Sequence, residues 1–190
     1  IWIRAPLRAI PFRLEWLFLL SEELDQARLK ILSDLKQRPN MNGDIKIGKL
    51  TALRAIYKKD NDISHELWAN FELRKALNKK LSLSLPISET KKLLREYWGT
   101  YLVATPYDFH SYLLYMEKDR EPEKQFYVPR MKVLRPIVQD LQDLADGKLN
   151  VYGLSLPPGS GKSTCGILYM TWLMGRNPDM PSLASAYADK

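Results

Sequence analysis

The residues between Val151 and Thr164 constrain the fold of this chain more than any other stretch. An apolar run, residues 151–156, is followed by two prolines, a loop with two glycines, and Lys-Ser-Thr at the start of a helical pattern. Such a loop exposes successive backbone N–H groups at the positive end of a helix, and this arrangement binds phosphate groups. The sequence therefore predicts a polyphosphate site.

The predicted contacts to the phosphates of ATP come from Gly159, Ser160, Gly161, Lys162, Ser163 and Thr164. Lys162 is the predicted catalytic residue, because its ammonium neutralises phosphate charge, and Ser163 is the predicted Mg²⁺ ligand. The loop departs from the strict pattern at Leu156, where glycine is usual. Hydrolysis also needs a second carboxylate on the metal and a residue that orients water. We expect both beyond residue 190, so we expect the chain alone to be nearly inactive.

Charge and composition narrow the class of protein. The net charge of +7 and a pI of about 9.4 suit a polyanionic partner such as nucleic acid, and a merely basic surface is the alternative. One cysteine, Cys165, leaves no internal disulfide. We expect it to be a small packed side chain, with a reactive thiol as the alternative. No apolar run is long enough to cross a bilayer.

Apolar residues recur at spacings of three and four through residues 1–117, which predicts a mainly α-helical N-terminal region. The predicted helices cover residues 14–35, 47–57, 63–80, 88–103 and 107–116, and Ser64 is the predicted N-cap of the third. Residues 81–86 fit either a short strand or a connector. Three roles stay open for this region: an appendage that touches DNA or a partner subunit, a lid on the following domain, or sequence that partly fails to order alone.

The character of the chain changes after residues 118–124, a charged, proline-containing run that we predict to be a linker. Residues 125–190 are the predicted start of a second, incomplete domain. Its predicted elements are helices at 131–144 and 162–174 and strands at 151–156 and 182–187. Strand, loop, helix and strand form the opening βαβ of an α/β P-loop NTPase, so we predict that fold, truncated after its first βαβ.

Four stretches in the last third of the chain carry a family resemblance. They are Asp146-Gly147-Lys148, Leu156-Pro157-Pro158 with Gly161-Lys162-Ser163, the run Thr171-Trp172-Leu173-Met174-Gly175-Arg176-Asn177-Pro178-Asp179, and residues 183–189. In these stretches the chain resembles the ATPase domain of the large terminase subunit of tailed bacteriophages, the motor that packages DNA into procapsids. One departure is Gly159-Ser160, where many members of that family carry an arginine.

The resemblance implies an ATPase of the additional-strand P-loop class that uses Mg²⁺ and ATP to translocate double-stranded DNA. It also implies a homo-oligomeric ring in the bacterial host cytoplasm, with the portal protein and the small terminase subunit as partners and no membrane partner. In the full-length protein it implies a further endonuclease domain. The alternatives are a helicase-like P-loop ATPase that acts on nucleic acid, or a non-catalytic interaction module with a vestigial loop.

Terminases hold adenine with a short segment upstream of the phosphate loop. The corresponding candidates here are Gln125, Tyr127, Arg130 and Gln139, with Arg135 beside Gln139. An aromatic ring can stack on the base and a glutamine amide can read its edge. The alternative is that Phe126 and Tyr127 only pack the edge of the domain.

Overall fold

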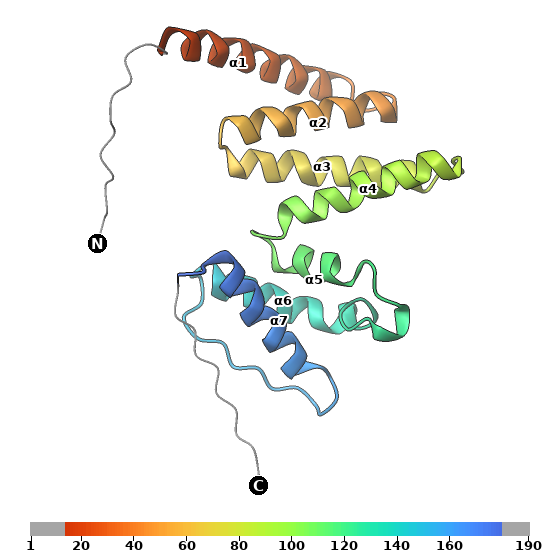
Figure 1. The fold of residues 1–190 in the computed structure, drawn as a ribbon, viewed down its shortest axis with the longest axis vertical. Helices are drawn as coiled ribbons and strands as arrows, with labels where there is room; N and C mark the ends of the chain where they lie inside the picture. Colours follow the sequence, from red (N-terminus) through yellow and green to blue (C-terminus); the bar gives the residue numbers. More distant parts are fainter. Residues whose placement is uncertain (1–13, 180–190) are drawn as a thin grey trace. The chain divides into compact units, whose positions relative to one another are not determined.

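Every regular element among residues 14–179, the part of the chain that the structure describes, is a helix (Figure 1). The structure is a computed structural model, with side chains described from Glu23 onward. The elements are α1 (Leu14–Gln37), α2 (Gly43–Lys59), α3 (Ile63–Leu81), α4 (Ile87–Ala104), α5 (Phe109–Glu117), the 3-10 turns η1 (Pro122–Lys124) and η2 (Val128–Arg130), α6 (Met131–Ala145) and α7 (Lys162–Arg176). The predicted α/β fold is therefore wrong for these residues, which form an all-α structure. None of these helices is long and apolar enough to cross a membrane.

The helical part of the prediction is confirmed, and its errors lie at the helix ends. The N-cap of α3 is Asp62 rather than Ser64, because an Asp62 carboxylate oxygen accepts the backbone N–H of His65 at 3.2 Å. Aspartate satisfies an orphan N–H as well as serine does and adds a favourable charge at the helix N-terminus. Residues 82–86 form a connector between α3 and α4, not a strand.

The first of two compact units comprises Ile1–Ala76. Within it α1, α2 and the first part of α3 run alternately in opposite directions (Figure 1). Its core includes Leu53, Tyr57 and Ala69, against which Ile31, Leu32 and Leu35 of α1 pack. The buried side chain of Asn70 accepts a hydrogen bond from Arg54 Nη1 at 3.1 Å. Burial of apolar side chains between the three helices therefore stabilises this unit.

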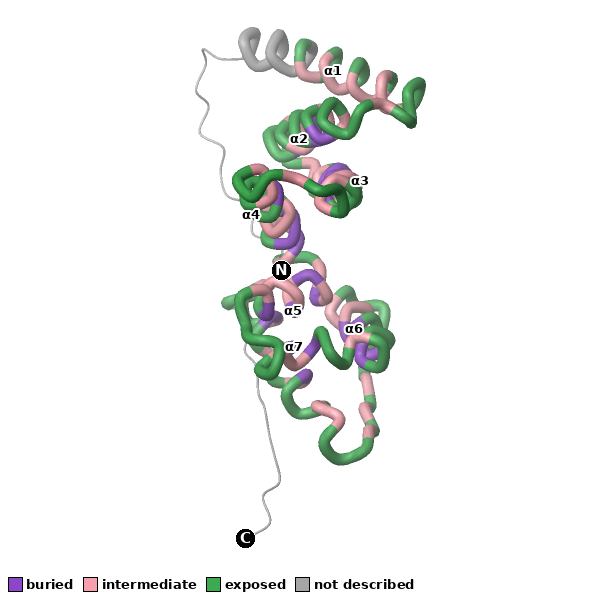
Figure 2. Tube along the Cα trace, turned by 90° about the vertical axis from the view of Figure 1, so that its right-hand side faces the viewer, coloured by how far each residue is buried: buried purple, intermediate pink, exposed green. Residues whose placement is uncertain are grey.

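The second unit, Leu77–Lys190, has an aromatic core between α5, α6 and α7. Figure 2 shows buried positions on all three of these helices. The ring of Phe109 lies 5.3 Å from that of Tyr169 and 5.1 Å from that of Trp172, measured between centroids. Gln142 of α6 joins the helices further, because its Oε1 accepts from Phe109 N at 2.8 Å and its Nε2 donates to Tyr107 O at 3.1 Å. This core holds the start of α7, and with it the predicted loop.

Residues 151–156 have no regular secondary structure and do not form the predicted strand. Tyr152, Leu154 and Leu156 are half-buried and pack against the aromatic core, whereas Val151 is 85% exposed. This alternation is the period of a strand with one buried face. A strand also needs a neighbour for its backbone groups, and none pairs with it within residues 14–179. The second predicted strand, residues 182–187, lies outside the described residues.

Candidate nucleotide-phosphate site

The predicted phosphate-binding loop is a tight turn that leads directly into α7. Ser160 N donates to Pro157 O at 3.3 Å and closes the turn. Gly159 and Gly161 have φ values of +77° and +91°, which residues with a side chain rarely adopt. Gly161 is the residue immediately before the first turn of α7. The backbone path therefore requires both glycines of the motif.

The N-terminus of α7 has unused backbone donors. Helical bonding begins at Cys165 N, which donates to Gly161 O at 2.9 Å. The N–H groups of Lys162, Ser163 and Thr164 have no acceptor within the described part of the chain, as is usual in a first helical turn. Together with the positive end of the helix dipole, these donors can bind an anion.

The side chains of the first turn are open to solvent. Lys162, Ser163 and Thr164 are all exposed. The Lys162 ammonium folds back over its own loop and donates to the carbonyl oxygen of Leu156 at 3.1 Å. To reach a phosphate at this turn, it must exchange a neutral acceptor for an anionic one. The exchange favours phosphate, because the ammonium then gains an attraction between opposite charges that the neutral carbonyl does not provide.

The predicted metal ligand, Ser163, presents its hydroxyl at the same exposed turn. Mg²⁺ usually has few protein ligands and takes its other ligands from phosphates and water. Among residues 23–179 there is no cluster of three or more His, Cys, Asp or Glu side chains arranged to hold a metal. The role of Ser163 stays a prediction, and the donors present fit a metal that arrives with the phosphates.

A buried carboxylate fixes the segment that faces the loop. Glu117, the last residue of α5, is only 2% exposed. One of its oxygens accepts from Phe126 N and Tyr127 N, both at 2.7 Å, and the other accepts from Val128 N at 3.0 Å. Three N–H donors offset the cost of burying the charge. We call this set the Glu117 clamp. Sequence reasoning missed it, because a glutamate beside a charged run has the pattern of a solvated surface.

The Glu117 clamp holds an aromatic ring against the phosphate loop. A Cβ on Gly161 would lie 2.2 Å from Cε2 of Phe126, so the ring lies directly beside this glycine. The Arg130 guanidinium lies 5.7 Å from the centre of the same ring, and its Nη1 donates to Phe126 O at 3.1 Å. Close approach of Phe126 is therefore a second reason, besides the positive φ, for glycine at position 161.

The candidate adenine contacts fall in different places. Gln125 and Arg130 adjoin Phe126, where Gln125 Nε2 donates to Arg120 O at 3.1 Å. Gln139 lies on the exposed face of α6, and its amide donates to Asp143 at 3.3 Å. The structure thus brings two of the four candidates beside a ring that touches the loop. Their contact with adenine stays a prediction.

Tyr127, the third candidate, is fully buried. Its hydroxyl lies 2.6 Å from His110 Nδ1, and Arg135 Nη1 lies 2.8 Å from His110 Nε2. Since a guanidinium only donates, Nε2 must accept and Nδ1–H must donate to the tyrosine oxygen. Burial raises the pKa of Tyr127 to about 12. This placement favours the alternative in which Tyr127 packs the domain edge.

Two of the stretches that carry the family resemblance meet at the far end of α7. The buried Trp172 donates from Nε1 to Thr105 O at 2.7 Å. The Arg176 guanidinium lies 4.7 Å from the Trp172 ring centre, and its Nη1 is 3.6 Å from an Asp146 oxygen, an ion pair rather than a hydrogen bond. These contacts give Trp172, Arg176 and Asp146 a structural role behind the loop.

Cys165 follows the loop in the first turns of α7 and is fully buried. Burial raises the pKa of its thiol, which favours the protonated form. The geometry favours a packed side chain over a reactive thiol.

Comparison of the chain with models of protein families, with curated proteins and with solved structures finds no match. The terminase resemblance therefore depends on the motif residues quoted above.

Proposed function

We propose that residues 159–164 bind the phosphate groups of ATP and that the chain belongs to a terminase-like, DNA-packaging ATPase. The observation that carries the first part is the set of N–H groups at Lys162, Ser163 and Thr164 that have no acceptor among residues 14–179, preceded by two glycines with positive φ. The sequence motif and this geometry both support phosphate binding. Cargo and assembly depend on the resemblance and on the net charge of +7.

In this proposal the backbone supplies orientation and Lys162 supplies charge. The amides of the first α7 turn would hold phosphate oxygens, and the ammonium would move from the Leu156 carbonyl to the terminal phosphates. Ser163 would add one oxygen to the Mg²⁺ that accompanies the nucleotide. Hydrolysis of the bound ATP would drive the translocation of double-stranded DNA into a procapsid. The homo-oligomeric ring, the portal protein and the small terminase subunit enter the proposal through the resemblance alone.

Titration of the full-length protein with a fluorescent ATP analogue tests phosphate binding. Lys162→Ala removes a hydrogen bond to a charged group, worth about 1.5 to 3 kcal/mol, but also the competing bond to the Leu156 carbonyl, so we expect affinity to fall by about tenfold. Lys91→Ala, at an exposed position of α4 and outside the loop, α7 and the candidate adenine contacts, is the matched control and should bind as the parent does. Equal affinity and equal ATP turnover in Lys162→Ala and parent would refute the proposal.

The kind of ATPase is tested separately on the same protein. A packaging motor should hydrolyse ATP faster when duplex DNA is added and should leave its strands paired. Strand separation would favour the helicase-like alternative. Absence of any ATP binding by the parent protein would favour the interaction module with a vestigial loop.

A further inference from the structure

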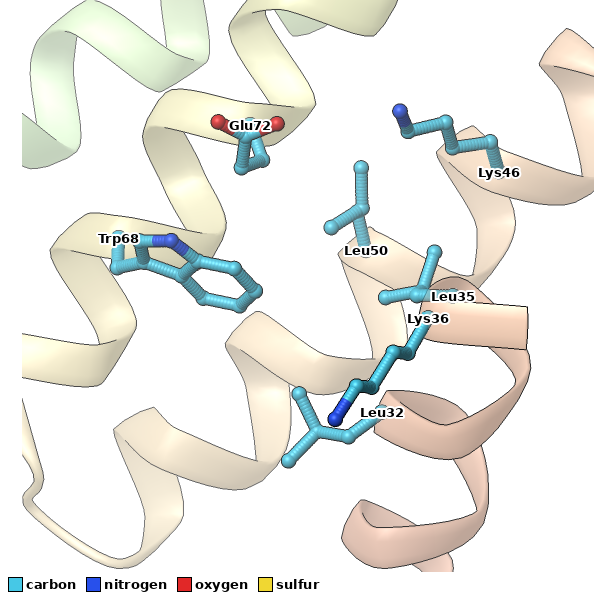
Figure 3. Close-up of a pocket in the computed structure, with 7 residues that line it drawn as sticks. All are labelled: Leu32, Leu35, Lys36, Lys46, Leu50, Trp68 and Glu72. Carbon is cyan, nitrogen blue, oxygen red and sulfur yellow. The ribbon is translucent and has the colours of Figure 1, made fainter. Parts of the chain in front are cut away.

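A groove in the first compact unit has no part in the proposed phosphate site. It lies between α1, α2 and α3 and has a volume of about 350 Å³ (Figure 3). Its lining consists of Leu32, Leu35, Lys36, Lys46, Leu50, Trp68 and Glu72. We call it the α1–α3 groove. Its volume is at the lower end of the range of about 300 to 1,000 Å³ found for ligand pockets, which suits a few apolar side chains.

The walls of the α1–α3 groove are apolar. Leu50 is buried, and Trp68, on the opposite wall, remains 43% exposed. Figure 3 shows the Trp68 ring facing the same hollow as the three leucines. An indole left this open is a frequent energetic centre of a protein interface. Leu29 and Phe71 are also exposed, and each lies three residues along its helix from a groove residue, so the apolar surface extends along α1 and α3.

The charges at the rim are unbalanced. The carboxylate of Glu72 is already paired with Lys75 at 2.8 Å, and Asp34 of α1 is paired with Lys49 of α2. Lys36 and Lys46 line the groove and have no carboxylate partner within the part of the chain whose side chains are described. An apolar hollow thus has two ammonium groups on its α1 and α2 side, free to pair with an incoming anion.

We infer that the α1–α3 groove binds an acidic amphipathic helix of a partner protein. Such a helix inserts apolar side chains spaced by three or four residues into a hydrophobic groove. Carboxylates beside these anchors would form ion pairs with Lys36 and Lys46. These pairs would set the orientation of the bound helix and its rate of association. Both features of the groove, the open indole and the unmatched lysines, are complementary to this one occupant.

This inference distinguishes between contact with DNA and contact with a partner subunit, which the sequence left open for the N-terminal region. Duplex DNA is bound mainly through phosphates by rows of Lys and Arg, and it has no apolar anchors for a hollow of this kind. The groove therefore favours contact with a partner subunit. The inference holds whether or not residues 159–164 bind nucleotide.

The test uses a labelled helical peptide with leucines at i, i+3 and i+7, glutamates beside these leucines and alanines elsewhere, titrated with the whole chain by fluorescence anisotropy. We expect micromolar binding that weakens with salt, and a loss of at least about tenfold in Trp68→Ala. The double variant Lys36→Glu with Lys46→Glu should no longer bind the glutamate peptide. It should instead bind a peptide in which lysines replace the glutamates. Lys58→Glu with Lys59→Glu, exposed at the end of α2 and outside the groove, is the matched control and should bind as the parent does.

Gain of the lysine peptide is a positive signal that an unfolded variant cannot produce. Three outcomes would overturn the inference: no binding of the glutamate peptide by the parent, equal binding by the groove and control double variants, or displacement of the peptide by duplex DNA through the same two lysines. None of these readouts uses ATP, so they are independent of the test of the phosphate site.

Discussion

Removal of the buried carboxylate of Glu117 tests whether the Glu117 clamp holds residues 126–128 beside the phosphate loop. Glu117→Ala leaves the N–H groups of Phe126, Tyr127 and Val128 without their acceptor. We expect a large loss of stability in the second compact unit, because these three donors converge on one buried charged group.

The magnitude follows from the three bonds. Hydrogen bonds to a charged group contribute about 1.5 to 3 kcal/mol each, which sets an upper bound of about 5 to 9 kcal/mol for the set. Val128 is itself exposed, so water can replace part of that bond. We therefore expect a loss of about 3 to 5 kcal/mol, comparable to breaking a buried ion pair and a large share of a typical total of about 5 to 15 kcal/mol. Glu117→Gln keeps one oxygen acceptor and the shape, and should lose about 1 to 3 kcal/mol.

Urea denaturation followed by tryptophan fluorescence measures the loss, since Trp172 lies in the same core. With a slope of about 2 kcal/mol per molar urea, the Glu117→Ala midpoint should fall by about 2 M. Hydrogen exchange at the amides of residues 126–128 should accelerate in the same variant. Glu121→Ala is the matched control: its ion pair with Lys124 is well exposed, so its loss should be under about 1 kcal/mol.

The reasoning fails if Glu117→Ala and Glu121→Ala unfold at the same urea concentration with unchanged exchange at residues 126–128. Exchange that accelerates without a shift in the midpoint would also contradict the expected magnitude, since the segment would then be uncoupled from the core.

Two further predictions concern Gly161, which lies beside Phe126, and Tyr127, which belongs to the Glu117 clamp. Gly161→Ala places a Cβ 2.2 Å from Phe126 at a φ of +91°, so it should destabilise the second unit by about 2 to 4 kcal/mol in thermal unfolding. Adding Phe126→Ala removes the clash and should recover part of that stability. A double variant that is no more stable than Gly161→Ala would contradict the clash. Burial raises the pKa of Tyr127 to about 12, so as the pH rises above about 10 the unfolded chain loses the Tyr127 hydroxyl proton before the folded chain does. The free energy of unfolding should therefore fall by up to about 2 to 3 kcal/mol between pH 10 and 12. Tyr127→Phe should flatten that fall; an equally steep fall in the variant would assign it to other groups.

Helices were predictable from this sequence because each one carries its own periodicity. The stretches that became α1, α3 and α6 show apolar spacings of three and four, and their predicted limits fall within a few residues of the observed ones. The strand at residues 151–156 was not predictable in the same way. Tyr152, Leu154 and Leu156 do pack against the core, but a strand also depends on a neighbour that local sequence does not specify.

In the candidate site, too, the residues set by local sequence were predictable and those set by contacts distant in sequence were not. Gly159 and Gly161 were predictable, because the turn of the motif needs the positive φ values that both adopt. The phosphate contact of Lys162 stays a prediction, since its ammonium donates to the Leu156 carbonyl. Glu117 and Phe126 were not predictable, since their contacts join residues nine or more positions apart and depend on how α5 meets the following turn. Burial of Tyr127 likewise follows from the shared core of α5, α6 and α7 rather than from its own neighbours in sequence.

The hydrogen bond between Lys162 and the Leu156 carbonyl gives the two prolines that follow Leu156 a thermodynamic role. A residue before proline is held in the extended region of backbone conformation, and Pro157 and Pro158 themselves have fixed φ angles, so this carbonyl has little freedom to turn away. It offers the ammonium a preorganised intramolecular acceptor that competes with any incoming anion. Phosphate affinity at this loop would then measure the difference between two hydrogen bonds rather than the strength of one, and replacing either proline would change that affinity without removing a single group that touches the ligand.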